Sequence, residues 1–214
     1  MLRTIMALVA ASALTTPAGA VSFADIAEGG TFQSTLGERV GFEGSWAAVV
    51  GAADAGIIDN GVTIFATAGA SDPYFDEYSG GKPAGLGVCK TTASFQCAGS
   101  ADDNLRFEGG EYLDLMFDRK VEVTSLSFRD GDHNVIAAGS FLLDGIVRSI
   151  TDGLADLTGL GALDGMRIAA TAETPFIYAE QATVAPIPLP APASLLIGGV
   201  AALAMAGRRK PATA

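Results

Sequence analysis

The sequence contains a single histidine, His133, and only two cysteines. Catalytic zinc sites take three protein ligands from His, Cys or carboxylate groups, and a Ser-His-Asp triad places its histidine beside a nucleophile. Neither arrangement has support here, and the cysteines lack the CxxC spacing that would indicate a redox or metal role. We therefore expect His133 to be a solvated or hydrogen-bonded loop residue, and we expect the protein not to be an enzyme.

Basic residues are scarce: the chain has 13 Lys and Arg residues and 24 Asp and Glu residues. Four of the cations, Arg3, Arg208, Arg209 and Lys210, lie near the chain ends, so residues 21–184 hold nine cations against all 24 acids and carry a net charge of −15. Such an acidic surface disfavours nucleic acid and anionic lipid and attracts cations. The alternative is that the acidity only keeps an exported protein soluble.

The apolar run near the N-terminus is short. It extends from Ile5 to Leu14, follows the single cation Arg3, and precedes the small residues Ala18 and Ala20. A retained membrane anchor needs about 20 apolar residues, whereas this pattern is typical of a cleaved export signal. We predict a signal peptide over residues 1–20 that is cut after Ala20.

A proline-rich stretch at residues 185–192 precedes a second apolar segment. Proline fixes the backbone angle φ and offers no amide donor, so this stretch is predicted to be a stiff, extended spacer. Residues 193–214 follow as an apolar helix with a basic stop, whose cations would hold its end in the cytoplasm. The body would then face outward.

This C-terminal pattern resembles the VPLPA variety of the PEP-CTERM sorting tail, with Ile187 in place of the motif's valine. The resemblance implies a Gram-negative source, association with extracellular polysaccharide, and a membrane tether until the tail is processed by an exosortase, a membrane-embedded cysteine transpeptidase. It assigns the sorting role to Pro188, Leu189, Pro190, Ala191, Arg208 and Arg209. The alternative is a single-pass anchor that is never cut.

Residues 21–184 are long enough for one domain with a core, and they carry mainly strand signals. Turn pairs predict hairpins at Ile57–Ala68 and Phe141–Val147, because Asn60-Gly61 and Asp144-Gly145 adopt positive φ easily. Further strands are expected at 112–118, 121–128, 166–171 and 176–184, with a bulge between Val123 and Leu126.

Glycine-rich and Asp-rich loops are expected at 71–85, 98–104 and 151–165, with a helical turn near 153–157. Many short strands joined by such loops predict an all-β fold, an antiparallel β-sandwich of jelly-roll or lectin-like topology. A β-barrel is the alternative. The order of motifs from about residue 60 to 184 is similar to an exported domain often found ahead of these tails; the resemblance supports the sandwich and supplies no activity.

The two cysteines, Cys89 and Cys97, have seven residues between them. In an oxidising compartment an isolated close pair is typical of a disulfide. We predict a Cys89–Cys97 bond that staples a loop.

A possible calcium site lies at Asp130, Asp132 and Asn134, three oxygen-bearing side chains in alternate positions. The segment is not an EF-hand, because Val135 and Phe141 stand where that loop needs Gly and Glu. Asp102 and Asp103, with Asn104 and Glu111, could complete the ligand set. The alternative is a turn in which Asp and Asn hydrogen-bond to their own backbone.

Three functions are compatible with these features. We favour an exported, envelope-sorted, non-enzymatic protein that acts at the cell surface or in an exopolysaccharide matrix by binding or as a structural part. A calcium-assisted carbohydrate-binding module is the second, and an extracellular glycan hydrolase with a carboxylate pair is the third. Trp46, Tyr74, Phe75 and Tyr78 could stack on a sugar ring or pack against a sheet edge.

Overall fold

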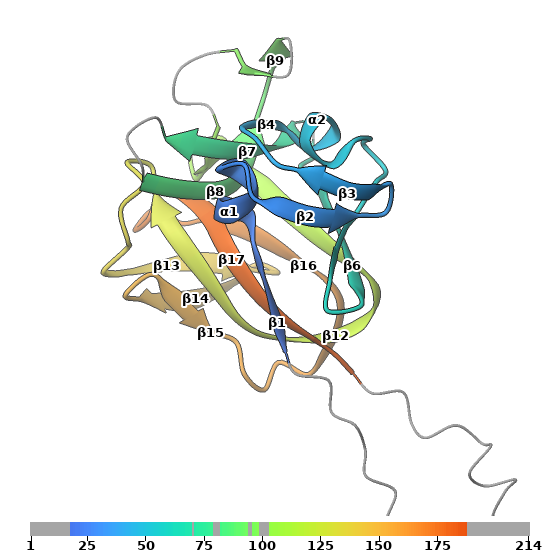
Figure 1. Ribbon diagram of the computed structural model, residues 1–214. Coiled ribbons are helices and arrows are strands. Elements are labelled where there is room, and N and C mark those ends of the chain that lie inside the picture. The colour runs from blue at the N-terminus through green and yellow to red at the C-terminus, as the bar shows by residue number, and fades with distance from the viewer. Residues whose placement is uncertain (1–17, 70, 79–81, 94–95, 99–102, 188–214) are drawn as a thin grey trace, which may run out of the picture. The chain divides into compact units, whose positions relative to one another are not determined.

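The computed structural model describes residues 18–187 apart from 70, 79–81, 94–95 and 99–102 (Figure 1). These residues belong to one compact unit. Residues 1–17 of the predicted signal peptide and the whole sorting tail from Pro188 onward, including the predicted C-terminal helix, lie outside the described residues. Within the described part of the chain, no helix is long and apolar enough to cross a membrane.

The described chain is dominated by antiparallel strands, which confirms the all-β class. Two short helices, α1 (Phe23–Ala27) and α2 (Trp46–Val50), occur in the N-terminal part. The strands of that part are β1 (Gly19–Ser22), β2 (Thr31–Ser34), β3 (Gly37–Val40), β4 (Gly44–Ser45), β5 (Ile57–Asp59), β6 (Val62–Thr67), β7 (Asp72–Tyr78) and β8 (Lys82–Cys89). The later strands are β9 (Thr92–Ala93), β10 (Gln96–Cys97), β11 (Leu105–Arg106), β12 (Tyr112–Asp130), β13 (Ala138–Leu143), β14 (Ile146–Thr151), β15 (Leu154–Asp156), β16 (Ala162–Ala170) and β17 (Phe176–Pro186).

Five strands close on themselves in the order β12, β16, β13, β14, β15 and back to β12. The last contact is made by β15, whose Ala155 lies opposite Leu126 of β12. Inside, the rings of Phe128 and Phe141 pack with their centroids 4.5 Å apart. This part of the molecule is therefore a closed barrel, the alternative expected from the sequence, rather than a clear two-sheet sandwich.

Strand β12 spans 19 residues and takes part in both halves of the sheet. Its first half pairs with β6 and β16, and its second half pairs with β17 and β15. Leu113, Leu115 and Phe117 are buried on one face, as the alternation predicted. The pairing of β12 with β17 shifts between Val123 and Ser125, which confirms the predicted bulge.

Both predicted hairpins are present. Asn60 and Gly61 have φ of 46° and 75° and join β5 to β6, while Asp144 and Gly145 have φ of 51° and 79° and join β13 to β14. The two predicted C-terminal strands are also confirmed, as β16 and β17.

Two predicted loops are wrong. The segment 71–85 is mostly the hairpin β7–β8, and 151–165 contains strand β15 where a helical turn was expected. The glycine at position 85 of the first segment is explained by close packing of two strands. A Cβ at Gly85 would lie 2.3 Å from the carbonyl oxygen of Ala179 in β17. Only glycine lets β8 lie this close to β17.

Aromatic residues near the N-terminal helices form part of the core. Trp46 stacks on Phe75 with ring centroids 5.4 Å apart, and its indole N–H donates to the carbonyl oxygen of Ala55 at 3.0 Å. Trp46, Tyr74 and Phe75 are all buried, so these three pack inside the fold and are not available to stack on a ligand. The side chain of Tyr78 lies outside the described residues.

Strand β17 spans 11 residues and connects two regions of the domain. Its C-terminal half pairs with β1, where Gly19 lies opposite Val184 (Figure 1). Its first residues pair with β11 and with the end of β12, where Ile177 lies opposite both Leu105 and Asp130. The two ends of the described chain are therefore neighbours, and the loops around residues 104–106 and 130–134 lie at the opposite end of β17.

Candidate functional site

A cavity of about 610 Å³ lies at the N-terminal end of β17. Its charged lining residues are Arg106 from β11, Asp130 at the end of β12, Asp132 in the turn that follows, and Glu173 from the loop before β17. Phe176, the first residue of β17, adds an aromatic ring to the lining. The volume is typical of small-molecule sites, which measure about 300–1,000 Å³.

Asn104 and Arg106 are held in place by backbone pairing on two sides. The amide of Val88 in β8 donates to the carbonyl oxygen of Asp103 at 3.1 Å, and Leu105 pairs with Ile177. A Cβ at Gly87 would lie 1.9 Å from that same carbonyl oxygen. The glycine therefore allows the segment that carries Asn104 to lie directly against β8.

Asn104 also lines the cavity, and its side chain is unusual. The residue is 4% exposed, and its Oδ1 is buried without a hydrogen-bond partner among the described residues. A buried carbonyl oxygen left without a donor costs about 1–3 kcal/mol, and more than nine in ten buried polar groups avoid this cost by pairing. The cavity wall thus includes a residue whose buried carbonyl oxygen has no donor among the described residues.

The turn at residues 130–134 is organised by one carboxylate. Oδ1 of Asp130 accepts from the backbone amides of Asp132 at 2.9 Å and of Asn134 at 2.8 Å. The amide of His133 donates to the carbonyl oxygen of Asp130 at 2.9 Å, and His133 has a positive φ of 63°. This is the turn in which an Asp binds its own backbone, the alternative to a calcium loop.

The other residues of the possible calcium set are dispersed. Asn134 accepts from Nζ of Lys82 at 2.7 Å, and Asp103 accepts from the hydroxyl of Tyr178 at 2.7 Å. Asp102 lies outside the described residues. Within the described ranges, no three His, Cys, Asp or Glu side chains form a group that could hold a metal ion.

Buried hydroxyl groups support the loop that carries Glu173. The hydroxyl of Ser140 donates to Oε2 of Glu173 at 2.6 Å and lies 3.0 Å from Oγ1 of Thr171. Thr174 donates to the carbonyl oxygen of Ser140 at 2.6 Å and accepts from its amide at 2.9 Å. The loop before β17 is therefore fixed to β13, which gives the cavity a rigid wall.

Arg106 and Phe176 face each other across the pairing of β11 with β17. The guanidinium carbon lies 5.6 Å from the ring centroid, within the range of a cation–π contact. Phe176 is 43% exposed, so much of its ring is open to solvent. The guanidinium and the ring together place a positive charge and an apolar surface at the cavity.

A cluster of buried ionisable groups lies around the only histidine. Nε2 of His133 lies 3.0 Å from Oδ2 of Asp76, and its ring meets that of Tyr178 edge-on, with centroids 5.1 Å apart. His133 is therefore buried in contact with other residues and is not solvated.

The ionisation of this cluster is perturbed. Burial raises the pKa of the Asp76 carboxyl to about 7, and the negative charge of Asp103 adds to this effect. Burial also raises the pKa of the Tyr178 hydroxyl, again with help from the charges of Asp76 and Asp103.

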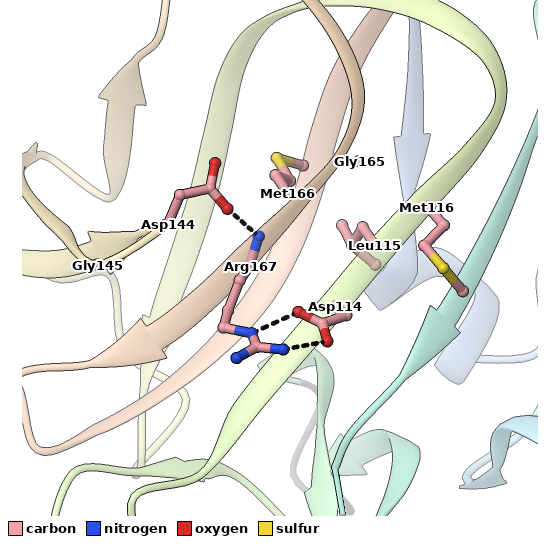
Figure 2. Close-up of a pocket in the computed structure, with 8 residues that line it drawn as sticks. All are labelled: Asp114, Leu115, Met116, Asp144, Gly145, Gly165, Met166 and Arg167. Atoms are coloured by element: carbon pink, nitrogen blue, oxygen red, sulfur yellow. Dashed lines mark hydrogen bonds and ion pairs between the residues drawn. The ribbon is translucent and has the colours of Figure 1, made fainter.

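A second depression, of about 620 Å³, lies over β12, β16 and the tip of the β13–β14 hairpin (Figure 2). Figure 2 shows Arg167 between two acids. Its guanidinium donates to both oxygens of Asp114 at 2.7 and 2.8 Å, and its amide donates to Oδ1 of Asp144 at 2.8 Å. The guanidinium also stacks on Tyr112, 3.8 Å from the ring centroid. The charges of this depression satisfy one another and anchor the hairpin tip to β16.

The predicted disulfide is confirmed. Cys89 and Cys97 are bonded, with Cα atoms 5.8 Å apart, and the bond spans the small hairpin β9–β10.

None of the protein families, characterised proteins or solved structures compared with this chain matches it.

Proposed function

We propose that this chain is an exported, envelope-sorted protein that works outside the cytoplasm by binding, or as a structural part of an extracellular polysaccharide layer, and not as an enzyme. Residues 1–20 act as its signal peptide. An exosortase acts on the tail at Pro188, Leu189, Pro190 and Ala191, and the helix at 193–214 tethers the chain until then.

The position of the cavity relative to the chain ends carries this proposal. Val21, the first residue after the predicted cut, lies opposite Ala182 near the end of β17, so both signals attach at one end of the body. The cavity lies at the other end of β17, about 33 Å from Pro186, because the 11 residues of this strand span ten steps of ~3.3 Å. A body held at its Ile187 end would present the cavity away from the membrane.

The contacts in the cavity favour binding over catalysis. Asp130 is engaged by the backbone of its own turn, and Glu173 by Ser140. His133 contacts Asp76 and Tyr178 and is not among the residues that line the cavity. Rigid polar groups with partners suit recognition of a ligand.

We keep the lectin-like sandwich as a proposal for the part of the sheet outside the closed barrel. Strands β8, β7 and β4 continue the sheet beyond β17. A second layer in this region would complete a sandwich beside the barrel.

Expression of the full chain in a Gram-negative host, with and without an exosortase, tests the proposal. We expect an N-terminus at Val21, labelling of the protein on intact cells by a membrane-impermeant amine reagent, and a shortened C-terminus only when the exosortase is present. A variant with Arg208 and Arg209 replaced by Ala is the matched control, which should be exported but not processed.

Two results would contradict the proposal. A cytoplasmic product that retains residues 1–20 would show that these residues are not an export signal. Turnover of an extracellular polysaccharide, lost in Glu173→Gln, would make the protein a hydrolase.

A further inference from the structure

We propose that the cavity at the N-terminal end of β17 binds a neutral glycan, with one sugar ring on Phe176 and its hydroxyl groups donating to Asn104, Asp132 and Glu173. The inference deepens the proposed binding function and rests on it for its biological setting. The binding chemistry itself is argued from the cavity alone.

The first step is the unsatisfied acceptor. Asn104 lines the cavity, and its Oδ1 is buried and accepts no hydrogen bond from the described residues. Its backbone is fixed by Val88 and by the pairing of Leu105 with Ile177, so the segment cannot readily turn to find another donor. A ligand that brings a donor to this oxygen would remove the cost of leaving it unpaired.

The second step is the kind of polar group that surrounds it. Asp132 is exposed, and its carboxylate accepts no hydrogen bond from the described residues. Glu173 is exposed as well and uses one oxygen for Ser140, which leaves Oε1 available. Carboxylate and amide oxygens accept hydrogen bonds, so the cavity selects a ligand rich in donors, and hydroxyl groups meet this need.

The third step is charge. Three carboxylates and one guanidinium line the cavity, so an anionic ligand such as a phosphate, sulfate or uronic acid would be repelled. The carboxylate of Asp130 already accepts from two backbone amides, and the guanidinium of Arg106 lies against the ring of Phe176. The net formal charge of one guanidinium and three carboxylates is −2, so a polyamine is the competing ligand, which the spermidine probe below distinguishes from a neutral glycan.

The fourth step is the apolar surface. A pyranose ring carries C–H groups on one face, and an exposed aromatic ring is a suitable platform for that face. Phe176 is 43% exposed and lies at the cavity. Gly131 allows this position, because a Cβ there would lie 3.0 Å from Cβ of Phe176.

The other large depression lacks these features. The charges of Asp114, Arg167 and Asp144 pair with one another, and none of its residues is among the buried groups without a partner in the described chain. It therefore supplies an internal comparison for the proposed site.

Calorimetric titration of the full chain, purified in a mild non-sugar detergent, tests the proposal with cellohexaose, maltohexaose and laminarihexaose as neutral probes. Hexagalacturonate and spermidine are the anionic and cationic probes. We expect at least one neutral hexasaccharide to bind, and we expect both charged probes to bind more weakly. Phe176→Ala should lower the affinity about five- to tenfold, and Asn104→Ala should lower it by a similar factor.

Two matched variants control for folding. Phe42→Ala removes a phenylalanine that is also 43% exposed and should leave the affinity unchanged, while Phe176→Tyr should retain binding because it keeps an aromatic platform. Absence of binding by all three neutral probes at millimolar concentration would overturn the proposal. So would tighter binding of hexagalacturonate or spermidine, or equal losses in Phe42→Ala and Phe176→Ala. None of these results would affect the test of export and tail processing.

Discussion

Nε2 of His133 lies 3.0 Å from Oδ2 of Asp76, and the two side chains are only 8% and 6% exposed. The pairing joins the turn after β12 to strand β7, and Tyr178 of β17 closes the cluster. Two segments that are distant in the sequence thus meet through ionisable side chains, which makes the stability of this end of the domain dependent on pH.

The first prediction concerns that dependence. Burial raises the pKa of folded Asp76 to about 7, above the unfolded value of about 3.9. The folded state therefore binds more protons between these values, and its stability falls as pH rises from about 4 to 7. We expect wild type to lose about 2–4 kcal/mol between pH 5 and 8 through this group, and Asp76→Asn to flatten the profile.

Urea denaturation at several pH values measures this effect. The carboxyls whose pKa is lowered, Asp118 and Asp156, titrate below this window and do not interfere. His133→Gln is the control that removes the partner of Asp76, while Asp103, Tyr178 and Glu43 still face the carboxyl. A wild-type profile as flat as that of Asp76→Asn would contradict the prediction.

The second prediction concerns the turn at residues 130–134. Asp130→Ala removes the acceptor of two backbone amides and should lower the free energy of unfolding by roughly 1–3 kcal/mol. We expect the same loss with calcium and with a chelator, because the carboxylate already serves the turn. Asp132→Ala is the control and should cost less than half as much.

Thermal unfolding with and without calcium distinguishes the two roles of Asp130. A melting temperature that rises with calcium in wild type and not in Asp130→Ala would show that the carboxylate is a calcium ligand after all.

The third prediction concerns Gly87. A Cβ there would lie 1.9 Å from the carbonyl oxygen of Asp103, so Gly87→Ala must displace the segment that carries Asn104. We expect a loss of about 1–3 kcal/mol from overpacking, together with weaker binding of the neutral hexasaccharide. In Gly109→Ala the nearest atom is a side-chain oxygen of Glu111 at 3.0 Å, so this control should be better tolerated. Chemical denaturation that ranks the two variants equally would refute the steric argument.

The fourth prediction concerns the disulfide. The loop closed by Cys89 and Cys97 is short, with a sequence separation of 8, so its loss should cost roughly 2–3 kcal/mol on the chain-entropy model. Denaturation of wild type and of the double variant Cys89→Ala/Cys97→Ala, each with and without reductant, measures this. Reductant should destabilise wild type alone. The intact mass should rise by two hydrogens on reduction, and free thiols in the native protein would disprove the bond.

The parts of the fold that could be predicted from the sequence are those determined by residues close together in the chain. The hairpins at Asn60-Gly61 and Asp144-Gly145 follow from residues that adopt positive φ, and the buried face of Leu113 and Leu115 follows from alternation along one strand. The turn at Asp130 was one of two alternatives, and its hydrogen bonds are made within five residues.

The parts that the sequence did not predict depend on contacts between distant segments. The glycines of strand β8 predicted a loop. In the structure Gly85 and Gly87 lie in a strand, and glycine is needed at both positions because the backbone of Ala179 and of Asp103 packs against them. Arg106, Glu173 and Phe176 were not predicted as site residues. The pairing of β11 with β17 brings Arg106 to Phe176, and Ser140 of β13 holds Glu173 in the loop before β17. Closure of the barrel likewise depends on three residue pairs between β15 and β12.

The course of β17 has a mechanical consequence. Its start lies at the cavity and its end leads to Ile187, with β12 paired along its length and β1 along its C-terminal half. Interstrand hydrogen bonds run perpendicular to antiparallel strands. A pull between a ligand held at Asp132, just after the end of β12, and an anchor beyond Pro186 would therefore load the bonds between β12 and β17 together in shear, and would not open them one at a time as peeling does.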